Sequence, residues 1–492
     1  MSTLQEVKTD YGKLKLFVEG EWIESESTNY QQVMNPALDR VIAEVPICKS
    51  SEVDQAVKIA NEAFEGWRSL PLTTRAGYIF KLKQKFDEYR EDISRITSQN
   101  HGKVIDESRG ETRRLIENIE TACSLAYTLT KGEHLDQIAT GIDGSSIREP
   151  LGAFGIIGPF NFPSMAPFWF IPIALAVGCT LVVKPSETTP LPMQRCFEII
   201  SEVGFPDGVV NMVHGSREAS EALVSHPDVR GICFVGSTPT AKHLYKLAGE
   251  HGKRAICQAG AKNYVVIGEG ADLEKAVLGL IPSCFGNTGQ RCLSGSNVVM
   301  IGEKNIALKE KFVEVASKLK LGYALDESVE MGPVVTKRSK ERILGYVEKG
   351  IDEGAKLLLD GRNVEVPDYP NGYFLGSSIF DGVTPDMTIG REEIFGPVVS
   401  MMNASNLQEA IDMINTKTEY GNSACLFTKS GKDASEFRKK ANVGNIGINI
   451  GVPAPMAFFP FGGRRQSFFG VLHGQIDSVD FFMDKKTVIE RW

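Results

Sequence analysis

The chain has 492 residues, 42% of them hydrophobic and 24% charged, and its formal net charge is −8. These values predict a soluble globular protein that divides into two or three domains. The negative charge argues against nucleic acid or an anionic membrane as a partner, because phosphate binding needs a basic surface. The nine scattered cysteines include no CxxC, and the seven histidines include no HxxxH or HExxH pair. We therefore expect reduced thiols, a cytoplasmic location and no metal site.

The first elements in chain order are short β-like segments at 14–18 and 21–23. Helices follow from Ser51, where Ser51 and Asp54 have the spacing of a capping box, and over 73–98 and 106–129. From Gly152 the pattern changes to apolar strands alternating with helices. The predicted strands are 153–157, 180–183, 209–212 and 231–234. This alternation is typical of a parallel sheet covered on both faces.

Two segments are considered as a signal peptide and as a membrane span, residues 1–10 and residues 165–183. The first segment is acidic and has no apolar core, so no signal peptide is expected. The second contains no charge and resembles a membrane span, but Pro167, Pro172 and Gly178 interrupt it. A buried helix that leads into a buried strand explains the run better than a membrane span does.

A second alternating block follows residue 292. It predicts a strand at 297–301 and helices at 304–319, 341–353 and 407–415. Residues 480–492 alternate apolar and polar side chains and predict a strand that has no obvious partner nearby. Such terminal strands often add to another sheet or to another subunit.

The segment 285–294 places Cys292 in a loop of small and polar residues. Its two glycines and the Asn287–Thr288 pair allow a sharp turn and a close approach to a ligand. Arg291, directly before the sulfur, is expected to favour the reactive thiolate. The alternative is a small buried hydrophobic residue, which is the usual state of a free cysteine.

Polar residues follow several of the predicted strands. Lys184 and Glu187 come directly after 180–183, where open α/β sheets bind ligands, although a solvated surface would also explain them. Ser237 lies in a strand-to-helix turn whose backbone N–H groups suit a phosphate, and an ordinary helix start explains that turn equally well. Asn161 lies in a rigid turn after 153–157. Its amide could stabilise an oxyanion or serve only the turn.

Five motifs in this order resemble the aldehyde dehydrogenase superfamily over nearly the whole chain. They are PFNFP at 159–163, KPSE at 184–187, FVGST at 234–238, GQRC at 289–292 and EEIFGPV at 392–398. The resemblance implies that Cys292 is the nucleophile and that Asn161 donates to the oxyanion together with the Cys292 backbone N–H. It also implies contacts with NAD, or with NADP as the alternative cofactor. Lys184 and Glu187 would bind the adenine ribose, Ser237 the pyrophosphate and Glu393 the nicotinamide ribose, and Phe395 would pack near the nicotinamide. Gly158, Phe160, Thr188 and Ala259 would complete the cofactor site.

The chain departs from the superfamily pattern at the residue that activates water. Most members have glutamate in an ELGGK-like motif, whereas this chain has Gln258, and an amide cannot accept a proton from water. A second glutamate, present in some members after a PFGG motif, is also missing. Ala241 stands where the phosphate turn usually has another glycine.

Within the superfamily, GAKN at 260–263, HGKR at 251–254 and SFFGVLHGQ at 467–475 are similar to methylmalonate-semialdehyde dehydrogenases. This likeness implies oxidation of a malonate-type semialdehyde, loss of carbon dioxide and acyl transfer to coenzyme A. A thiol is partly ionised near neutrality and needs less help from a base than water does. Arg114 and Arg291 are the candidate ligands for the substrate carboxylate. A solvated helix face is the alternative for Arg114.

The resemblance implies an α/β fold with a Rossmann-like cofactor domain (1–124 and 147–258), an α/β catalytic domain (259–457) and a small β oligomerisation element (125–146 and 458–492). We expect a homotetramer or a homodimer whose partners are a small aldehyde and coenzyme A. Two alternatives remain open. One is a hydrolytic NAD(P)-dependent aldehyde dehydrogenase that produces a free carboxylic acid, and the other is a binding protein that has lost the activity.

Overall fold

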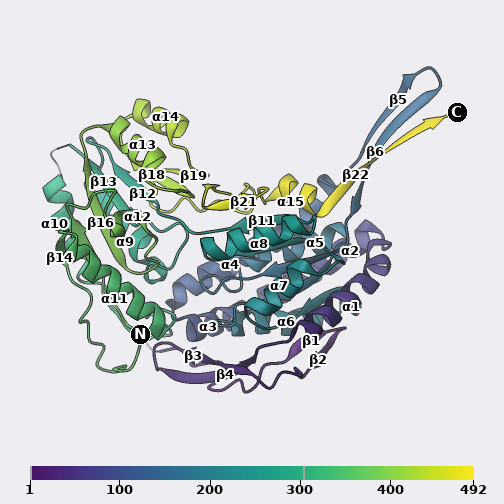
Figure 1. The fold of residues 1–492 in the computed structure, drawn as a ribbon, viewed down its shortest axis with the longest axis horizontal. Coiled ribbons are helices and arrows are strands. Elements are labelled where there is room, and N and C mark those ends of the chain that lie inside the picture. Colours follow the sequence, from purple (N-terminus) through teal and green to yellow (C-terminus); the bar gives the residue numbers. More distant parts are fainter. Residues whose placement is uncertain (1–2, 303–304) are drawn as a thin grey trace.

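Two large sheets and a projecting arm make up the protein (Figure 1). The computed structural model describes residues 3–302 and 305–492. The fold is the expected mixed α/β architecture with parallel strands in both large sheets.

The first sheet contains eight strands in the order β2-β1-β9-β8-β7-β10-β11-β21. Their bounds are Leu16–Val18 (β1), Glu21–Ile23 (β2), Ala153–Ile157 (β7), Thr180–Lys184 (β8), Val210–Met212 (β9), Val229–Val235 (β10), Arg254–Gln258 (β11) and Phe468–Gly470 (β21). Strands β9, β8, β7, β10 and β11 run parallel. The four strands predicted from residue 153 onward are therefore confirmed.

Helices cover both faces of this sheet because its strands are apolar on both sides. Phe154 and Ile156 pack with one group of helices, and Ala153 and Ile157 pack with the other. The first group is α2 (Leu72–Glu88), α3 (Arg90–His101), α4 (Ile105–Thr128), α5 (Ile171–Val177) and α6 (Leu191–Val203); the second is α1 (Ser50–Arg68), α7 (Arg217–Ser225) and α8 (Thr238–Glu250).

The second sheet contains seven strands in the order β14-β15-β16-β13-β12-β18-β19. Their bounds are Tyr264–Ile267 (β12), Asn297–Ile301 (β13), Lys356–Leu359 (β14), Ser378–Asp381 (β15), Val398–Ala404 (β16), Ser423–Phe427 (β18) and Asn445–Ile448 (β19). The helices of this unit are α9 (Leu273–Phe285), α10 (Asn305–Ala316), α11 (Lys337–Asp352), α12 (Thr388–Arg391), α13 (Leu407–Thr416) and α14 (Gly431–Lys440). The predicted start of α10 at residue 304 lies outside the described residues.

The remaining elements are short or belong to the arm. They are β3 (Tyr30–Asn35), β4 (Arg40–Pro46), β5 (Glu133–Ala139), β6 (Ile142–Pro150), η1 (Pro167–Trp169), η2 (Gly286–Gly289), β17 (Tyr420–Gly421), β20 (Arg464–Arg465), α15 (Gln475–Phe482) and β22 (Met483–Arg491). The C-terminal strand finds its partner in β6, with which it pairs antiparallel from Met483 to Arg491. Strands β22, β6 and β5 form the arm that extends from the body in Figure 1. The domain boundaries stay predictions.

Two local predictions were wrong in detail. The segment 73–98 is not one helix, because the chain breaks at Tyr89 between α2 and α3. Helix α1 begins at Ser50, and the capping carboxylate is Glu52, which accepts the backbone N–H of Lys49 at 2.9 Å. The apolar run 165–183 forms η1, α5 and the start of β8, as expected of a buried helix and strand. Within the described residues, no helix is long and apolar enough to cross a membrane.

Candidate active site

The loop that presents Cys292 follows α9 and includes η2. Asn287, Thr288 and Gly289 adopt left-handed backbone angles, with φ of 54°, 52° and 71°. The backbone N–H of Asn287 donates to the Glu107 carboxylate at 2.7 Å. Gly289 is required at its position, since an added Cβ would lie 2.0 Å from the carbonyl oxygen of Gly396. The glycine and the Asn-Thr pair therefore form the sharp turn that the sequence predicts.

Two asparagines hold the backbone of Cys292. The side-chain amides of Asn263 and Asn422 donate to the Cys292 carbonyl oxygen at 2.8 and 2.7 Å. Each asparagine directly precedes a strand, Asn263 before β12 and Asn422 before β18, and these two strands are parallel neighbours. Their starting ends therefore meet at one edge of the second sheet and fix the nucleophile loop there.

The Cys292 side chain is partly exposed, whereas the other eight cysteines, all in the described part of the chain, are buried. Its surroundings raise the pKa of the thiol to about 12, first through burial and then through the charge of Glu393. Arg291 lowers the pKa, as expected, but is the smallest cause. The direction expected for Arg291 is therefore right, but burial outweighs it and the resting thiol is protonated. Its guanidinium pairs with Glu107 at 2.7 Å, which offsets its charge.

Asn161 lies beside the nucleophile loop, although 131 positions of chain separate it from Cys292. Its side-chain Nδ2 donates to the Gln290 carbonyl oxygen at 3.0 Å. A primary amide has two N–H bonds, so one more remains for an oxygen in the site. The structure thus brings the candidate oxyanion donor next to the candidate nucleophile.

A fully buried ion pair, Lys103–Glu111, contacts the turn that carries Asn161. Lys103 Nζ donates to Glu111 Oε2 at 2.7 Å and to the Asn161 carbonyl oxygen at 2.5 Å. The other oxygen of Glu111 accepts the backbone N–H groups of Ser164 and Met165 at 3.0 and 3.1 Å. Glu111 of α4, with Lys103 just before the helix, is therefore tied to the turn that carries Asn161 and to the residues that follow it.

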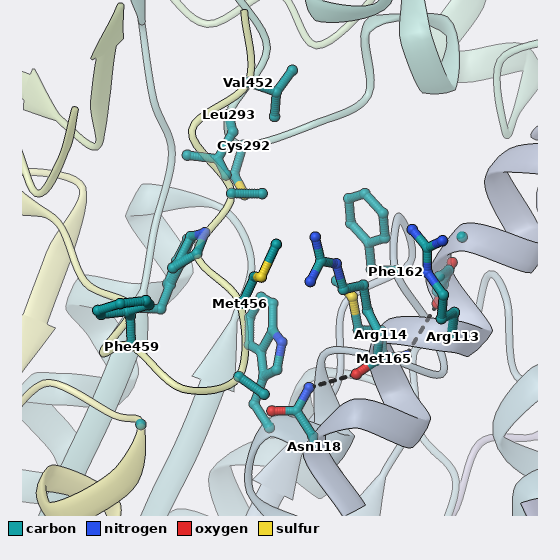
Figure 2. A pocket seen from close by; sticks show the side chains of 18 of the residues that line it. Arg113, Arg114, Asn118, Phe162, Met165, Cys292, Leu293, Val452, Met456 and Phe459 are labelled. Atoms are coloured by element: carbon teal, nitrogen blue, oxygen red, sulfur yellow. Dashed lines mark hydrogen bonds between the residues drawn. The ribbon is translucent and has the colours of Figure 1, made fainter. Parts of the chain in front are cut away.

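Cys292 opens into a cavity of about 350 Å³. Figure 2 shows Cys292 and Leu293 at one end and the α4 side chains Arg113 and Arg114 on the opposite side. Apolar walls separate them, formed by Phe162, Met165, Trp169, Ile173, Val452, Met456, Phe459 and Phe461. An apolar cavity with a few polar groups suits a small organic substrate.

Arg114 and Arg291, the candidate ligands for a substrate carboxylate, both line this cavity, and each pairs with a different glutamate. Arg291 pairs with Glu107, which also lines the cavity. Arg114 pairs with Glu117 at 2.6 Å, one turn along α4, and its guanidinium points toward the interior in Figure 2. The structure brings Cys292, Arg114 and Arg291 into one cavity.

The candidate cofactor residues gather at the carboxyl ends of the parallel strands. Gly158 follows β7, Lys184 ends β8 and precedes Glu187 and Thr188, Ser237 follows β10, and Ala259 follows β11. Lys184 Nζ lies 3.5 Å from Glu187 Oε2, and burial lowers the pKa of this lysine. Ser237 precedes α8 without a side-chain cap, so the first N–H groups of that helix have no helical partner. These groups fit an anionic ligand such as a pyrophosphate.

The second unit places Glu393 and Phe395 beside this edge of the first sheet. Glu393 Oε1 accepts the backbone N–H of Ala261 at 2.8 Å, and burial raises the pKa of this carboxyl to about 7. The Phe395 ring meets Phe160 edge-on, with 5.7 Å between the ring centroids. Residues from both units therefore face each other between the cofactor edge and Cys292.

Comparison with known proteins agrees with this geometry. The sequence profile described as "Aldehyde dehydrogenase family" matches residues 22–488. The chain belongs to the aldehyde dehydrogenase family. It is 46% identical to malonate-semialdehyde dehydrogenase 2 of Geobacillus kaustophilus (strain HTA426), over 97% of this chain and 99% of that protein. The malonate-semialdehyde dehydrogenase of Halalkalibacterium halodurans is 44% identical, over 98% of both chains.

Solved aldehyde dehydrogenase structures share the whole fold. A protein from Sinorhizobium meliloti 1021, assigned as a methylmalonate-semialdehyde dehydrogenase and solved with NAD, superposes with a TM-score of 0.96 at 38% identity, over 98% of each chain. Methylmalonate-semialdehyde dehydrogenase from Oceanimonas doudoroffii gives the same TM-score, identity and coverage. The aldehyde dehydrogenase-like fold class is therefore confirmed.

This aldehyde dehydrogenase has Gln258 at the end of β11, where most members have the glutamate that activates water. Gln258 is buried, and its side-chain nitrogen makes a hydrogen bond with Nε2 of His473. His473 lines the cavity, and burial lowers the pKa of its ring to about 3, so the ring is neutral at pH 7.

Several residues of the site were not found from the sequence. Lys103 lies in a His-Gly-Lys segment that could have attracted notice, and Asn263 lies in the GAKN segment already singled out. Glu111 and Asn422 gave no local signal, and His473 lies in the SFFGVLHGQ segment already singled out. Each acts through residues far away in the chain, so only the folded protein reveals its contacts.

Proposed function

We propose that this chain oxidises malonate or methylmalonate semialdehyde with NAD, through a thioester on Cys292, and transfers the acyl group to coenzyme A with loss of carbon dioxide. One observation above all supports this proposed reaction. Cys292 shares a cavity with Arg114 and Arg291, while the usual water-activating position holds the amide of Gln258. The relatives named as semialdehyde dehydrogenases support the same substrate class.

The cofactor edge of the first sheet fits a dinucleotide. Lys184 and Glu187 would hold the adenine ribose, Ser237 and the start of α8 the pyrophosphate, and Glu393 the nicotinamide ribose. A carboxylate at Glu187 suits ribose hydroxyls and opposes a 2′-phosphate, so NAD is expected over NADP. When bound, NAD supplies the hydride acceptor of the oxidation.

Cys292 and Asn161 would carry the first bond changes. The Cys292 sulfur adds to the aldehyde carbon, and the resulting oxyanion receives hydrogen bonds from Asn161 Nδ2 and the Cys292 backbone N–H. Because the thiol is protonated at rest, its proton must leave as the C–S bond forms. Oxidation of this adduct gives a thioester on Cys292.

Arg114 and Arg291 would hold the substrate carboxylate during the later steps. Loss of carbon dioxide leaves an electron pair on the neighbouring carbon, which then takes a proton. The thiolate of coenzyme A attacks the thioester carbonyl, the bond between that carbon and the Cys292 sulfur breaks, and Cys292 leaves as thiolate. For malonate semialdehyde, the products would be acetyl-CoA, carbon dioxide and NADH.

Product analysis tests this proposal. Purified protein with malonate semialdehyde and NAD should form acyl-CoA when coenzyme A is present, and only slowly form free acid without it. Mass spectrometry of both products checks the result. Formation of free acid at equal rates with and without coenzyme A would mean that the chain is a hydrolytic aldehyde dehydrogenase instead.

We further propose that the arm of β5, β6 and β22 is an oligomerisation element of a homodimer or homotetramer. Every residue of β5 is exposed, including the apolar Leu135 and Ile138. Such an edge strand is a template for pairing with a second chain. A cytoplasmic location is also proposed, since all nine cysteines are free thiols, as expected in a reducing compartment.

A further inference from the structure

The side chain of Gln258 is turned toward His473 and does not line the cavity. It is 3% exposed, and although Gln258 ends a strand beside the site, it is not among the described residues that line the cavity. Its amide reaches His473 instead, across 215 positions of chain. His473 is the residue of this pair that faces the cavity with Cys292.

Aromatic side chains hold the His473 ring in place. The ring stacks on Trp169 with a centroid distance of 5.2 Å and an interplanar angle of 26°, and it contacts Phe170 at 4.8 Å. Its backbone exchanges hydrogen bonds with Phe461. The ring is therefore fixed on three sides, and its nitrogen offers Gln258 one defined position.

We propose that His473 is the positioning residue that fixes the side chain at position 258 away from the thioester, so that this position cannot assist the attack of water. Its ring, which packs on Trp169 and Phe461, holds the Gln258 side chain outside the cavity that contains Cys292. Water beside the thioester then meets neither a base nor the polar end of Gln258. This inference rests on the proposed thioester chemistry and names the contact that directs its last step.

The arrangement predicts non-additive effects of two substitutions. Gln258→Glu introduces a carboxylate, but the ring of His473 would bind it and hold it where the amide now lies. Hydrolysis should then rise only slightly. Removing the ring nitrogen with His473→Phe, which retains an aromatic ring in the stack, should release the new carboxylate toward the thioester.

The experiment compares the wild type, Gln258→Glu, His473→Phe and the double variant. Free acid released without coenzyme A is measured after single-turnover acylation. General-base catalysis contributes about 10²–10⁴-fold. We therefore expect a rise under ~3-fold for Gln258→Glu, none for His473→Phe, and at least ~10-fold over Gln258→Glu for the double variant.

Two results would overturn the inference: hydrolysis by Gln258→Glu as fast as by the double variant, or a double variant no faster than the wild type. In a further variant, His473→Asn is combined with Gln258→Glu, because asparagine again offers a hydrogen-bonding side chain at position 473. Its hydrolysis rate should fall back to that of Gln258→Glu alone. A rate as fast as that of Gln258→Glu/His473→Phe would contradict the holding role of residue 473. His226→Phe in the Gln258→Glu background is the matched control, because this buried histidine pairs with Asp54 outside the cavity. It should leave hydrolysis unchanged.

The two proposals fail differently. Absence of acyl-CoA from the wild type with coenzyme A would reject the proposed function, whatever the four hydrolysis rates are. If acyl-CoA forms but the two substitutions act additively, only the role of His473 is wrong. A thermal scan of each variant identifies loss of folding. If His473→Phe does not fold, His473→Leu, which also removes the ring nitrogens, replaces it with the same expected rates.

Discussion

Arg114 and Arg113 are neighbours on α4 that differ in direction. Arg114 points into the cavity, whereas the Arg113 side chain is 73% exposed (Figure 2). A hydrogen bond to a charged group contributes about 1.5–3 kcal/mol, which corresponds to roughly 10- to 100-fold in affinity. We expect Arg114→Met to raise KM for malonate semialdehyde by about that factor and to leave KM for propanal nearly unchanged.

Steady-state kinetics with both aldehydes check this prediction. Arg217→Met is the control, because this arginine of α7 is 78% exposed, pairs with Glu221 and does not line the cavity. The control should behave as the wild type with either aldehyde. Equal increases of KM for both aldehydes in Arg114→Met would show that this arginine shapes the cavity rather than binding a carboxylate.

Lys262 is a buried cation whose Nζ has no hydrogen-bond partner among the described residues. Burial lowers its pKa from 10.5 to about 7, so the native state binds fewer protons than the unfolded state between these values. The stability of the wild type should therefore rise with pH across this window, and the full cost of burying the charge applies below pH 7. Lys262→Met removes this cost. Its melting temperature should exceed that of the wild type more at pH 6 than at pH 9.

Thermal scans without cofactor, at one scan rate, measure this difference. Lys246→Met is the control, since the Lys246 side chain on α8 is 77% exposed and should change the melting temperature little at either pH. The same gain for Lys262→Met at both pH values would contradict a titrating buried amine.

At the scale of elements, the Lys103–Glu111 pair joins α4 to the turn that carries Asn161. Lys103→Met would leave the buried Glu111 carboxylate without its cation, a change that typically costs about 3–5 kcal/mol. The double variant Lys103→Met/Glu111→Gln removes both charges and keeps an acceptor for the Ser164 and Met165 N–H groups. It should be more stable than the single variant.

Denaturant midpoints and kcat separate stability from function here. Both variants lose the Lys103 hydrogen bond to the Asn161 carbonyl, so kcat should fall in both even where stability recovers. A double variant as unstable as Lys103→Met would mean that the carboxylate was not the source of the loss.

At the scale of the whole molecule, the arm presents apolar side chains that its own chain leaves uncovered. Leu135 is 66% exposed, Ile138 49% and Ile489 61%. Charges at these positions should prevent a second copy from packing there. We expect Leu135→Lys/Ile138→Lys to shift the protein to a smaller assembly, measured by size-exclusion chromatography with light scattering.

Phe80→Lys is the control for this shift, because Phe80 is 52% exposed on α2 and belongs to none of the three strands of the arm. It should keep the size of the wild type. An arm variant of unchanged size would remove the arm from the oligomer interface.

Local patterns were sufficient to predict much of the fold. The strands at 153–157 and 297–301 are continuous apolar runs, and the structure places both within the predicted bounds. The break at Tyr89 was missed because the helical pattern continues across it, and the two helices separate only through their different packing. The local pattern gave no partner for the C-terminal strand, because β6 lies more than 300 residues earlier, and only the family resemblance grouped this strand with the segment 125–146.

The sequence by itself determined the family, the nucleophile loop and the absence of a carboxylate at residue 258, because each depends on residue types at neighbouring positions. Only the tertiary structure decided how these residues work together. It cancels much of the charge of Arg291 with Glu107, fixes Cys292 from Asn422 across 130 positions of chain, and turns Gln258 toward His473. Such contacts join segments that fold against each other, and their distances and burial exist only once both sheets are packed.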